Sequence, residues 1–346
     1  MTGALVMVDR FGYVFVAELG ETVAARRWYV GPGRPLGFKL WSGQLLVADS
    51  LKGLLSLDLQ TGQLLVLANR ASDTGDVINY CNDLDVDLET GDVFFTSSTQ
   101  LPVAYDGARG FYDTMLCYLL DALRGARSGR LLRYSAATRQ TDTLLTDLAY
   151  ANGVALSGDA SFVAVAETNR ARVLKHWLAG PKRGETEVLV RDLPGLPDGV
   201  SRASDGGFWI ALVAPLSPLL KTLAPYPRLR TLASHFVGTF LQRHTRRAPP
   251  FSHKVCVFLL FLLTLAPTHP EFGTTTTTVR VPTGAVFPLI AKKWGAVLKI
   301  DETGAPADAL FDADGALVSS VSAVVQHGDR LFLGNLNGDF VSVIDL

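Results

Sequence analysis

The sequence predicts an all-β protein, a six-bladed β-propeller, and three observations carry this prediction. A motif of short apolar strands, separated by turns rich in Asp, Gly and Ser, recurs along the chain. Each copy supplies about four strands, the content of one propeller blade of roughly 40–50 residues. The 346 residues have room for about six copies. We therefore expect a single propeller domain over residues 1–346 rather than two domains.

The copies follow one another in order along the chain. Residues 35–37 lead into the strands of GQLLVADS and GLLSLDLQTGQLLVLA, and Asn82 leads into VFFTSS and GRLLRY. Asn152 leads into FVAVAET, Asp198 into FWIALV, and Ser320 into LFLGNL and FVSVIDL. The strands are β-branched or aromatic and the turns carry Asp-Gly, Thr-Gly or Gly-Asp pairs. We expect the last two strands to close the ring against the N-terminal strand, because closure removes exposed edges.

Two stretches interrupt this pattern. Leu101–Ser128 breaks the second copy, and Tyr112–Leu123 within it is predicted to be a short helix. Leu219–Pro288 is predicted to be an atypical insertion of low order that begins with a helix. It contains the apolar run Val255–Ala266, which as a helix rises about 18 Å against a hydrocarbon core of roughly 30 Å. We interpret the run as a buried or interfacial segment rather than a membrane span.

Composition excludes several classes of protein. The chain is 48% hydrophobic, which is too apolar for a disordered protein. Lys and Arg number 32 against 33 Asp and Glu, so no net basic field draws in nucleic acid. Three cysteines, Cys81, Cys117 and Cys256, show no metal-binding spacing and are predicted to be buried and apolar. The N-terminus lacks the pattern of a signal peptide.

Asn82, Asn152 and Asp198 stand at equivalent places in three copies of the motif. In a propeller the innermost strands begin around one central channel, so residues at these places converge on the axis. Two amide oxygens and one carboxylate suit Ca²⁺, which takes about 6–8 oxygen ligands. Asn and Asp also begin strands and cap turns for purely local reasons. The repeat therefore predicts a calcium site, with the local role as the alternative.

No nucleophile is visible in the sequence. There is no GxSxG elbow, and the serines Ser56, Ser97 and Ser98 lie in unrelated contexts. Most of the six histidines fall in the insertion or on outer strands, and His176 is expected to pack on an outer strand. Trp177 and Trp209 are expected to belong to the core.

A metal without a nucleophile favours one mechanism. A central Ca²⁺ polarises an ester or lactone carbonyl and binds water, and a nearby carboxylate takes the proton. Asp198 is the candidate for this catalytic role in addition to its role as a ligand. Asp83 and Asp85 flank Asn82, but strand alternation favours a turn or blade-surface role for both.

At these residues the chain resembles the strictosidine synthase-like family, including its adipocyte plasma membrane-associated protein branch. The resemblance is carried by GRPLGFKL, by CNDLDVD, and by the stretch from GRLLRYSAATRQ through ANGVALSGDASFVAVAET to LPDGVSRASDGGFWIAL. It covers about three-quarters of the chain and omits Leu219–Pro288. It implies a six-bladed propeller related to calcium-dependent lactonases and arylesterases. Their axial metal is held by Asn, Asn, Asp and a first-blade Glu, and the first three carry over to Asn82, Asn152 and Asp198.

Two departures from the family matter. The first-blade Glu falls near Ala4, where no acidic residue stands, and Glu18 on the next strand is a poor substitute. Strictosidine synthases themselves use a glutamate late in the chain, but here Ala323, Val325 and Gln326 stand where relatives often carry acids. The name-giving condensation of an amine with an aldehyde therefore has no residue to perform it.

Three functions stay open at this point. The first is a metal-assisted hydrolase of small-molecule esters or lactones, and the second a strictosidine synthase-type condensing enzyme. The third is a non-catalytic propeller that binds a ligand or partner, since propellers host many functions. We expect a monomer, and the resemblance implies residence in the secretory pathway or at a membrane.

Overall fold

The computed structural model describes residues 3–19, 24–216, 222–244, 276–280, 294–336 and 340–346. The chain forms two compact units. One comprises Met1–Ala151 with Ser234–Arg247, and the other comprises Asn152–Ala233 with Ala248–Leu346. No helix among the described residues is long and apolar enough to cross a membrane. The apolar run Val255–Ala266 lies outside the described residues.

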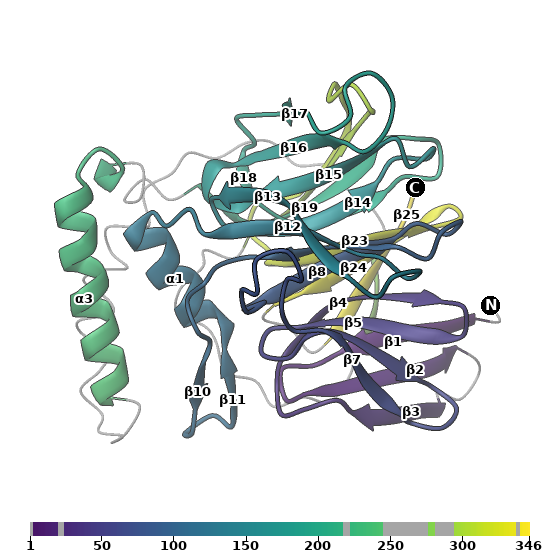
Figure 1. The fold of residues 1–346 in the computed structure, drawn as a ribbon, viewed down its shortest axis with the longest axis horizontal. Coiled ribbons are helices and arrows are strands. Elements are labelled where there is room, and N and C mark those ends of the chain that lie inside the picture. Colours follow the sequence, from purple (N-terminus) through teal and green to yellow (C-terminus); the bar gives the residue numbers. More distant parts are fainter. Residues whose placement is uncertain (1–2, 20–23, 217–221, 245–275, 281–293, 337–339) are drawn as a thin grey trace. The chain divides into compact units, whose positions relative to one another are not determined.

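The first unit contains three antiparallel sheets (Figure 1). The first has the order β1 (Gly3–Val8), β2 (Tyr13–Leu19), β3 (Ala24–Tyr29). The second runs β4 (Pro35–Trp41), β5 (Gln44–Asp49), β6 (Gly53–Asp58), β7 (Leu64–Ala68). The third runs β8 (Cys81–Val86), β9 (Val93–Ser97), β12 (Gly129–Tyr134), β13 (Thr141–Leu148). Between β9 and β12 the chain adds the hairpin β10 (Ala104–Asp106), β11 (Phe111–Asp113) and the helix α1 (Thr114–Arg124).

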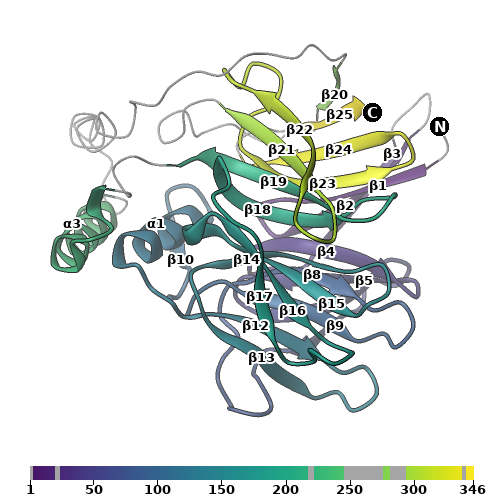
Figure 2. The same ribbon diagram turned by 90° about the horizontal axis from the view of Figure 1, so that it is seen from above.

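The second unit also contains three sheets, seen from above in Figure 2. The first runs β14 (Ala151–Leu156), β15 (Phe162–Glu167), β16 (Arg172–Trp177), β17 (Thr186–Val190), with the 3₁₀ turn η1 (Thr168–Arg170) after β15. The second runs β18 (Gly195–Arg202), β19 (Phe208–Pro215), β21 (Gly295–Ile300), β22 (Pro306–Asp312). The third runs β23 (Val321–His327), β24 (Arg330–Asn335), β25 (Phe340–Asp345), β20 (Thr276–Arg280).

These six meandering sheets are the blades of a six-bladed β-propeller, which confirms the predicted fold class. The helix predicted at Tyr112–Leu123 is α1, and the helix predicted at the start of the insertion is α3 (Pro227–His244). The prediction that the last strands close against the N-terminal strand is wrong. The C-terminal strand β25 has β24 on one side and β20 on the other, so its outer neighbour comes from Leu219–Pro288.

The first sheet corresponds to the outer three strands of the second. Asp9 Oδ1 accepts hydrogen bonds from the backbone N–H groups of the β1–β2 turn, as Asp49 Oδ1 does in the β5–β6 turn. Each turn ends on a glycine in the left-handed region, Gly12 at φ 94° and Gly53 at φ 84°. Thus β1 matches β5 rather than β4, and no described residue of the first sheet supplies an equivalent of β4.

Hydrophobic clusters fill the space between consecutive blades within each unit. In the second unit Phe162 of β15 meets Phe208 of β19 edge to face, with ring centroids 5.8 Å apart. Burying a side chain of this size contributes about 1.5–3 kcal/mol. Glycines let neighbouring first strands approach closely, because a Cβ on Gly153 would lie 2.3 Å from Asp198 O and one on Gly199 would lie 2.7 Å from Ser322 O. The starts of these strands are therefore held close together, and the candidate site lies there.

Candidate metal centre

The three candidate ligands lie at the start of the first strands of three blades. Asn82 lies on β8 in the first unit, and Asn152 and Asp198 lie on β14 and β18 in the second. Asn82 and Asn152 are buried, and Asp198 is half-buried. The structure brings Asn152 and Asp198 together, because the backbone of Gly153 packs against Asp198 O.

β-Bulges set the direction of two of these side chains. On β8 the pairing register passes from Cys81–Ser97 to Leu84–Phe95, so it skips Asn82 and Asp83. On β18 it passes from Pro197–Leu212 to Val200–Ile210, so it skips Asp198 and Gly199. Bulges occur next to active sites because they re-aim a side chain out of the regular alternation.

A relay of hydrogen bonds holds Asn82. Its Nδ2 donates to Ser98 Oγ at 2.8 Å, and Ser98 Oγ donates to the backbone oxygen of Ala151 at 2.6 Å. Ala151 is the residue directly before Asn152. Both contacts are buried, so the side-chain amide of Asn82 has one orientation.

The same relay holds Asn152. Its Nδ2 donates to Thr168 Oγ1 at 3.1 Å, and Thr168 Oγ1 donates to the backbone oxygen of Pro197 at 2.7 Å. Pro197 is the residue directly before Asp198. Each relay therefore ties the amide of one candidate ligand to the backbone beside the next candidate.

These relays determine which atom of each amide is available to a cation. The NH₂ group of each Asn is committed to a hydroxyl, so its carbonyl oxygen faces the other way. Among the described residues no group donates a hydrogen bond to Asn82 Oδ1. Amide and carboxylate oxygens are ligands that Ca²⁺ takes, so by their chemistry the three candidate side chains suit calcium. Among the described residues, no group of three or more His, Cys, Asp or Glu side chains could hold a metal ion.

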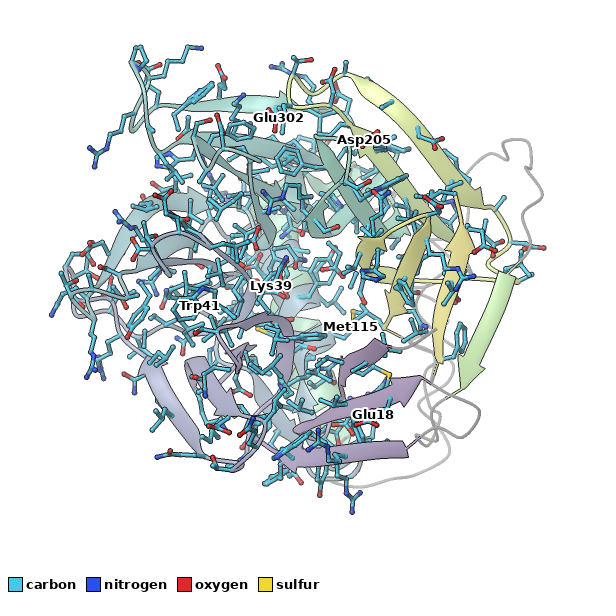
Figure 3. All side chains as sticks on the ribbon, turned by 90° about the vertical axis from the view of Figure 1, so that its right-hand side faces the viewer. Glu18, Lys39, Trp41, Met115, Asp205 and Glu302 are labelled. Carbon is cyan, nitrogen blue, oxygen red and sulfur yellow. The ribbon has the colours of Figure 1, made fainter. Side chains whose placement is uncertain are left out.

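The position expected for the first-blade glutamate needs correction. Ala4 lies on β1, which occupies the second position of its blade, whereas Asn82 and Asp198 lie on first strands. Glu18 pairs directly with Ala4 across β1 and β2 and is exposed near the end of β2 (Figure 3). Neither residue corresponds to the family's fourth ligand.

Asp83 and Asp85 have structural roles, as expected. Asp85 is buried and pairs with Lys39 of β4 at 3.2 Å, which links the second and third blades. Lys39 is labelled in Figure 3. Asp83 Oδ1 accepts from the N–H of Leu84 and lies against Gly37 of β4. The two carboxylates therefore stabilise the contact between β4 and β8.

The serines are occupied by structural hydrogen bonds. Ser97 Oγ donates to Asn79 O at 2.6 Å and Ser56 Oγ donates to Gln44 Oε1 at 3.3 Å, while Ser98 belongs to the relay. Among the described residues, no histidine is hydrogen-bonded to any of these three hydroxyls. They lack the activating base that a serine nucleophile requires.

The remaining candidates are structural. His176 is buried, and its Nδ1 lies 2.9 Å from Thr186 Oγ1 on the outer strand. Burial lowers the pKa of His176. Trp209 is a core residue, whereas Trp177 is half-buried at the edge of the core.

The late repeat carries no acid at the positions expected from the family. Gln326 Oε1 accepts from Trp209 Nε1 at 2.9 Å and from Ser204 N at 3.0 Å, and Val325 is exposed. Gln326 thus ties β23 to β19 and is not available as a catalytic acid or base.

Sequence analysis missed Ser98 as a functional residue and did not single out Thr168. A signal existed, because each hydroxyl lies 16 residues after its Asn. Both stand at the end of the second strand of a copy, in VFFTSS and FVAVAET. Hydroxyls are common in strands, so this spacing gains meaning only once the contact is seen.

The fold defines the class of protein first. The chain matches a gluconolactonase structure from Xanthomonas campestris with a TM-score of 0.57 at 14% identity, over 99% of this chain and 82% of the other. It matches the calcium-binding protein regucalcin from Agrobacterium tumefaciens with a TM-score of 0.52 at 12% identity, over 98% of this chain and 88% of the other. At these identities the likeness shows a shared propeller fold.

Comparison of sequences identifies more similar proteins. Residues 82–181 match the family model of strictosidine synthase. Protein STRICTOSIDINE SYNTHASE-LIKE 13 of Arabidopsis thaliana is 39% identical over 202 residues, which are 58% of this chain and 46% of that protein's length. The adipocyte plasma membrane-associated protein of Rattus norvegicus is 28% identical over 97% of this chain and 78% of its own length. Residues 82–181 thus match a strictosidine synthase family domain, and the similar full-length proteins are strictosidine synthase-like and adipocyte plasma membrane-associated proteins.

Proposed function

We propose that the protein is a calcium-dependent hydrolase of small-molecule esters or lactones, with Asn82, Asn152 and Asp198 as metal ligands. The observation that carries the proposal is the repeated relay, in which Ser98 and Thr168 bind the NH₂ groups of the two Asn side chains. A purely local role for Asn does not require the same relay in two blades. The likeness to a gluconolactonase and to a calcium-binding propeller supports the proposal through the fold.

The chain's own residues supply orientation and charge. Asn82 and Asn152 present amide oxygens, and Asp198 presents the one carboxylate of the set. When bound, calcium polarises a carbonyl and increases the acidity of a water molecule. We assign Asp198 the additional role of accepting a proton from that water, because it is the only anionic member of the set. We expect the protein to act as a monomer.

Binding of calcium is tested without reference to activity. Calcium should raise the melting temperature of the wild-type chain, because at 100 times the Kd it stabilises the folded state by about 2.7 kcal/mol. Asp198→Ala should abolish this shift, since affinity depends on ligand charge. Asp205→Ala is the control, because Asp205 pairs with Lys299 on an exposed turn, and it should keep the shift (Figure 3). An equal shift in wild type and Asp198→Ala refutes the metal assignment.

Hydrolysis is tested separately with phenyl acetate and a γ-lactone. Activity should require calcium, disappear with EGTA and return when calcium is restored. Activity that ignores EGTA, or no hydrolysis by a chain that binds calcium, contradicts the proposed reaction. In the second case the protein is a metal-binding propeller without this activity.

A further inference from the structure

Three arginine side chains gather on one aromatic ring in the first unit. The Cζ atoms of Arg10, Arg34 and Arg109 lie 5.3, 5.7 and 4.8 Å from the centroid of Phe111. They come from three elements, namely the β1–β2 turn, the residue before β4, and the β10–β11 hairpin. Like charges repel, so such a gathering needs an explanation.

Arg109 is neutralised by carboxylates of its own hairpin. Its Nε donates to Asp106 Oδ2 at 2.5 Å, and its Nη2 pairs with Asp113. Asp113 also caps α1 by accepting from Leu116 N at 2.9 Å. Asp106 and Asp113 are therefore engaged with Arg109, and Asp113 also with the helix.

Arg34 is in a different situation. It is half-buried, and among the described residues no carboxylate lies within ion-pair distance of it. Among these residues, the one hydrogen bond of its side chain runs from Nη1 to Tyr112 O at 3.3 Å, although a guanidinium has five N–H donors. Burial lowers the pKa of Arg34 and the charge of Arg10 lowers it further, while Tyr80 and Asp113 oppose this. The group still stays charged at neutral pH because an arginine begins so high.

The backbone places Arg34 at the end of the blade where the candidate site lies. The oxygen of Arg34 accepts from Ser50 N at 3.0 Å, as the oxygen of Tyr80 accepts from Ser98 N at 2.9 Å. Arg34 thus occupies in the second blade the position that Tyr80 occupies in the third, two residues before Asn82. Arg34 therefore lies at the end of its blade that corresponds to the end carrying Asn82 in the next blade.

We propose that Arg34, with Arg10 beside it over Phe111, binds the oxyanion of a small-molecule ligand, a carboxylate or a phosphate group. The planar fork of a guanidinium matches either group with two parallel hydrogen bonds. The ring of Phe111 holds the guanidinium in place, so less freedom is lost when the anion binds. The site lies within the first unit and does not depend on the proposed calcium centre. If the hydrolase proposal also holds, the ester or lactone substrate carries a carboxylate or phosphate group.

Binding is measured by calorimetry in low salt with EGTA present, so that calcium plays no part. The probes are benzoate, phenyl phosphate and inorganic phosphate, with benzamide as the neutral analogue of benzoate. We expect saturable binding of at least one oxyanion and none of benzamide. Arg34→Gln should weaken that binding at least tenfold. Benzoate binding without phosphate binding identifies a carboxylate site, and the reverse result identifies a phosphate site.

Arg26→Gln is the matched control, because Arg26 lies 5.5 Å from the Trp28 ring on an exposed surface and should bind the probes as wild type does. If Arg34→Gln does not fold, Arg34→Lys decides, since it keeps the charge and loses the fork; we expect at least a threefold weaker binding. The proposal is overturned if no oxyanion binds saturably, if benzamide binds as tightly as the oxyanion that binds, or if the folded Arg34 variant binds as wild type does.

Discussion

Two hydroxyl groups orient the amides of the candidate metal site. Ser98 and Thr168 each accept a hydrogen bond from an Asn side chain and donate one to a backbone oxygen, so each satisfies two buried groups at once. Buried polar groups left without partners are costly, so these hydroxyls matter for stability as well as for orientation.

Thr168→Val removes the hydroxyl and keeps the shape of the side chain. Asn152 Nδ2 and Pro197 O each lose the partner described above, so we expect the free energy of unfolding to fall by about 1–3 kcal/mol. Calcium affinity should fall with it, and Thr168→Ser should restore both. Urea unfolding and calcium titration provide the measurements. Thr186→Val removes the contact to His176 and should leave calcium affinity unchanged. If Thr186→Val and Thr168→Val lowered calcium affinity equally, this would argue against the relay.

The single residue Asp49 should make the stability of the protein depend on pH. It is fully buried, its Oδ2 has no partner among the described residues, and burial raises its pKa against the opposing N–H groups of Leu51 and Lys52. Because the folded pKa is raised, stability is greatest below the unfolded value of about 3.9 and is lost as pH rises through the folded value. Asp49→Asn stays neutral, so its stability relative to wild type should increase as pH rises above about 4.

Urea unfolding at several pH values measures this trend. Asp58→Asn is the control, because hydrogen bonds from Thr61 N, then from Gln44 and Gln60 N, lower the pKa of the half-buried Asp58. Its relative stability should change with pH in the opposite direction. The same slope in both variants would contradict the burial argument.

At the scale of the element, glycines determine how closely first strands approach. Gly153 and Gly199 each follow a candidate ligand, and each faces the backbone of the next first strand. The bulges and the glycines act together, since the bulge re-aims the ligand and the missing Cβ allows its neighbour to come near.

Gly153→Ala should separate β14 from β18. The new Cβ would lie 2.3 Å from Asp198 O and Val200 N, both backbone atoms that cannot move independently. We expect a loss of about 1–3 kcal/mol in the free energy of unfolding, as for overpacking in a core, and weaker calcium binding. Gly158→Ala is the control, because its Cβ would meet only Glu302 Oε1 at 3.9 Å, and its effect should stay within about 0.5 kcal/mol.

At the scale of the whole molecule, buried thiols report on unfolding. Cys81 and Cys117 are free and buried in the first unit. Burial raises the pKa of Cys81 well above its usual value, and it raises the pKa of Cys117 to about 12, with the Asp121 and Asp113 charges adding to it. The thiolate is the reactive form of cysteine. Both thiols are therefore protected in two ways, because burial keeps reagents away and the raised pKa keeps the sulfur protonated.

Both thiols should therefore react with a disulfide reagent only when the first unit opens. In a Cys256→Ser background, which removes the thiol outside the described residues, native labelling should be slow and should accelerate with urea alongside loss of structure. Mass spectrometry assigns the labelled residue. Labelling of Cys81 in native buffer as fast as in urea would show that the first unit is not closed around it.

Much of this architecture follows from the chain alone, because a blade is local. Each meander is built from consecutive strands with their own turn residues, so the repeat predicts the blades, and the helix α1 is predicted from a stretch that interrupts the repeat. The same register predicts that Asn82 and Asp198 begin first strands, and it predicts Asn152 at the equivalent place. Local hydrogen bonding and alternation suffice for these predictions.

The structure decided what depends on contacts between distant segments. The pairing of β20 with β25 joins residues 60 to 68 positions apart, and no local pattern at Thr276–Arg280 indicates it. The place of β1 as a second strand became clear only from its match with β5, and this removed Ala4 from consideration as a ligand position. The sequence by itself determined the repeat and the candidate ligands, because both are written in short-range pattern. Only the tertiary structure decided how Ser98, Thr168 and Arg34 are used, because a hydroxyl or a guanidinium takes its role from the partners that folding brings to it or withholds.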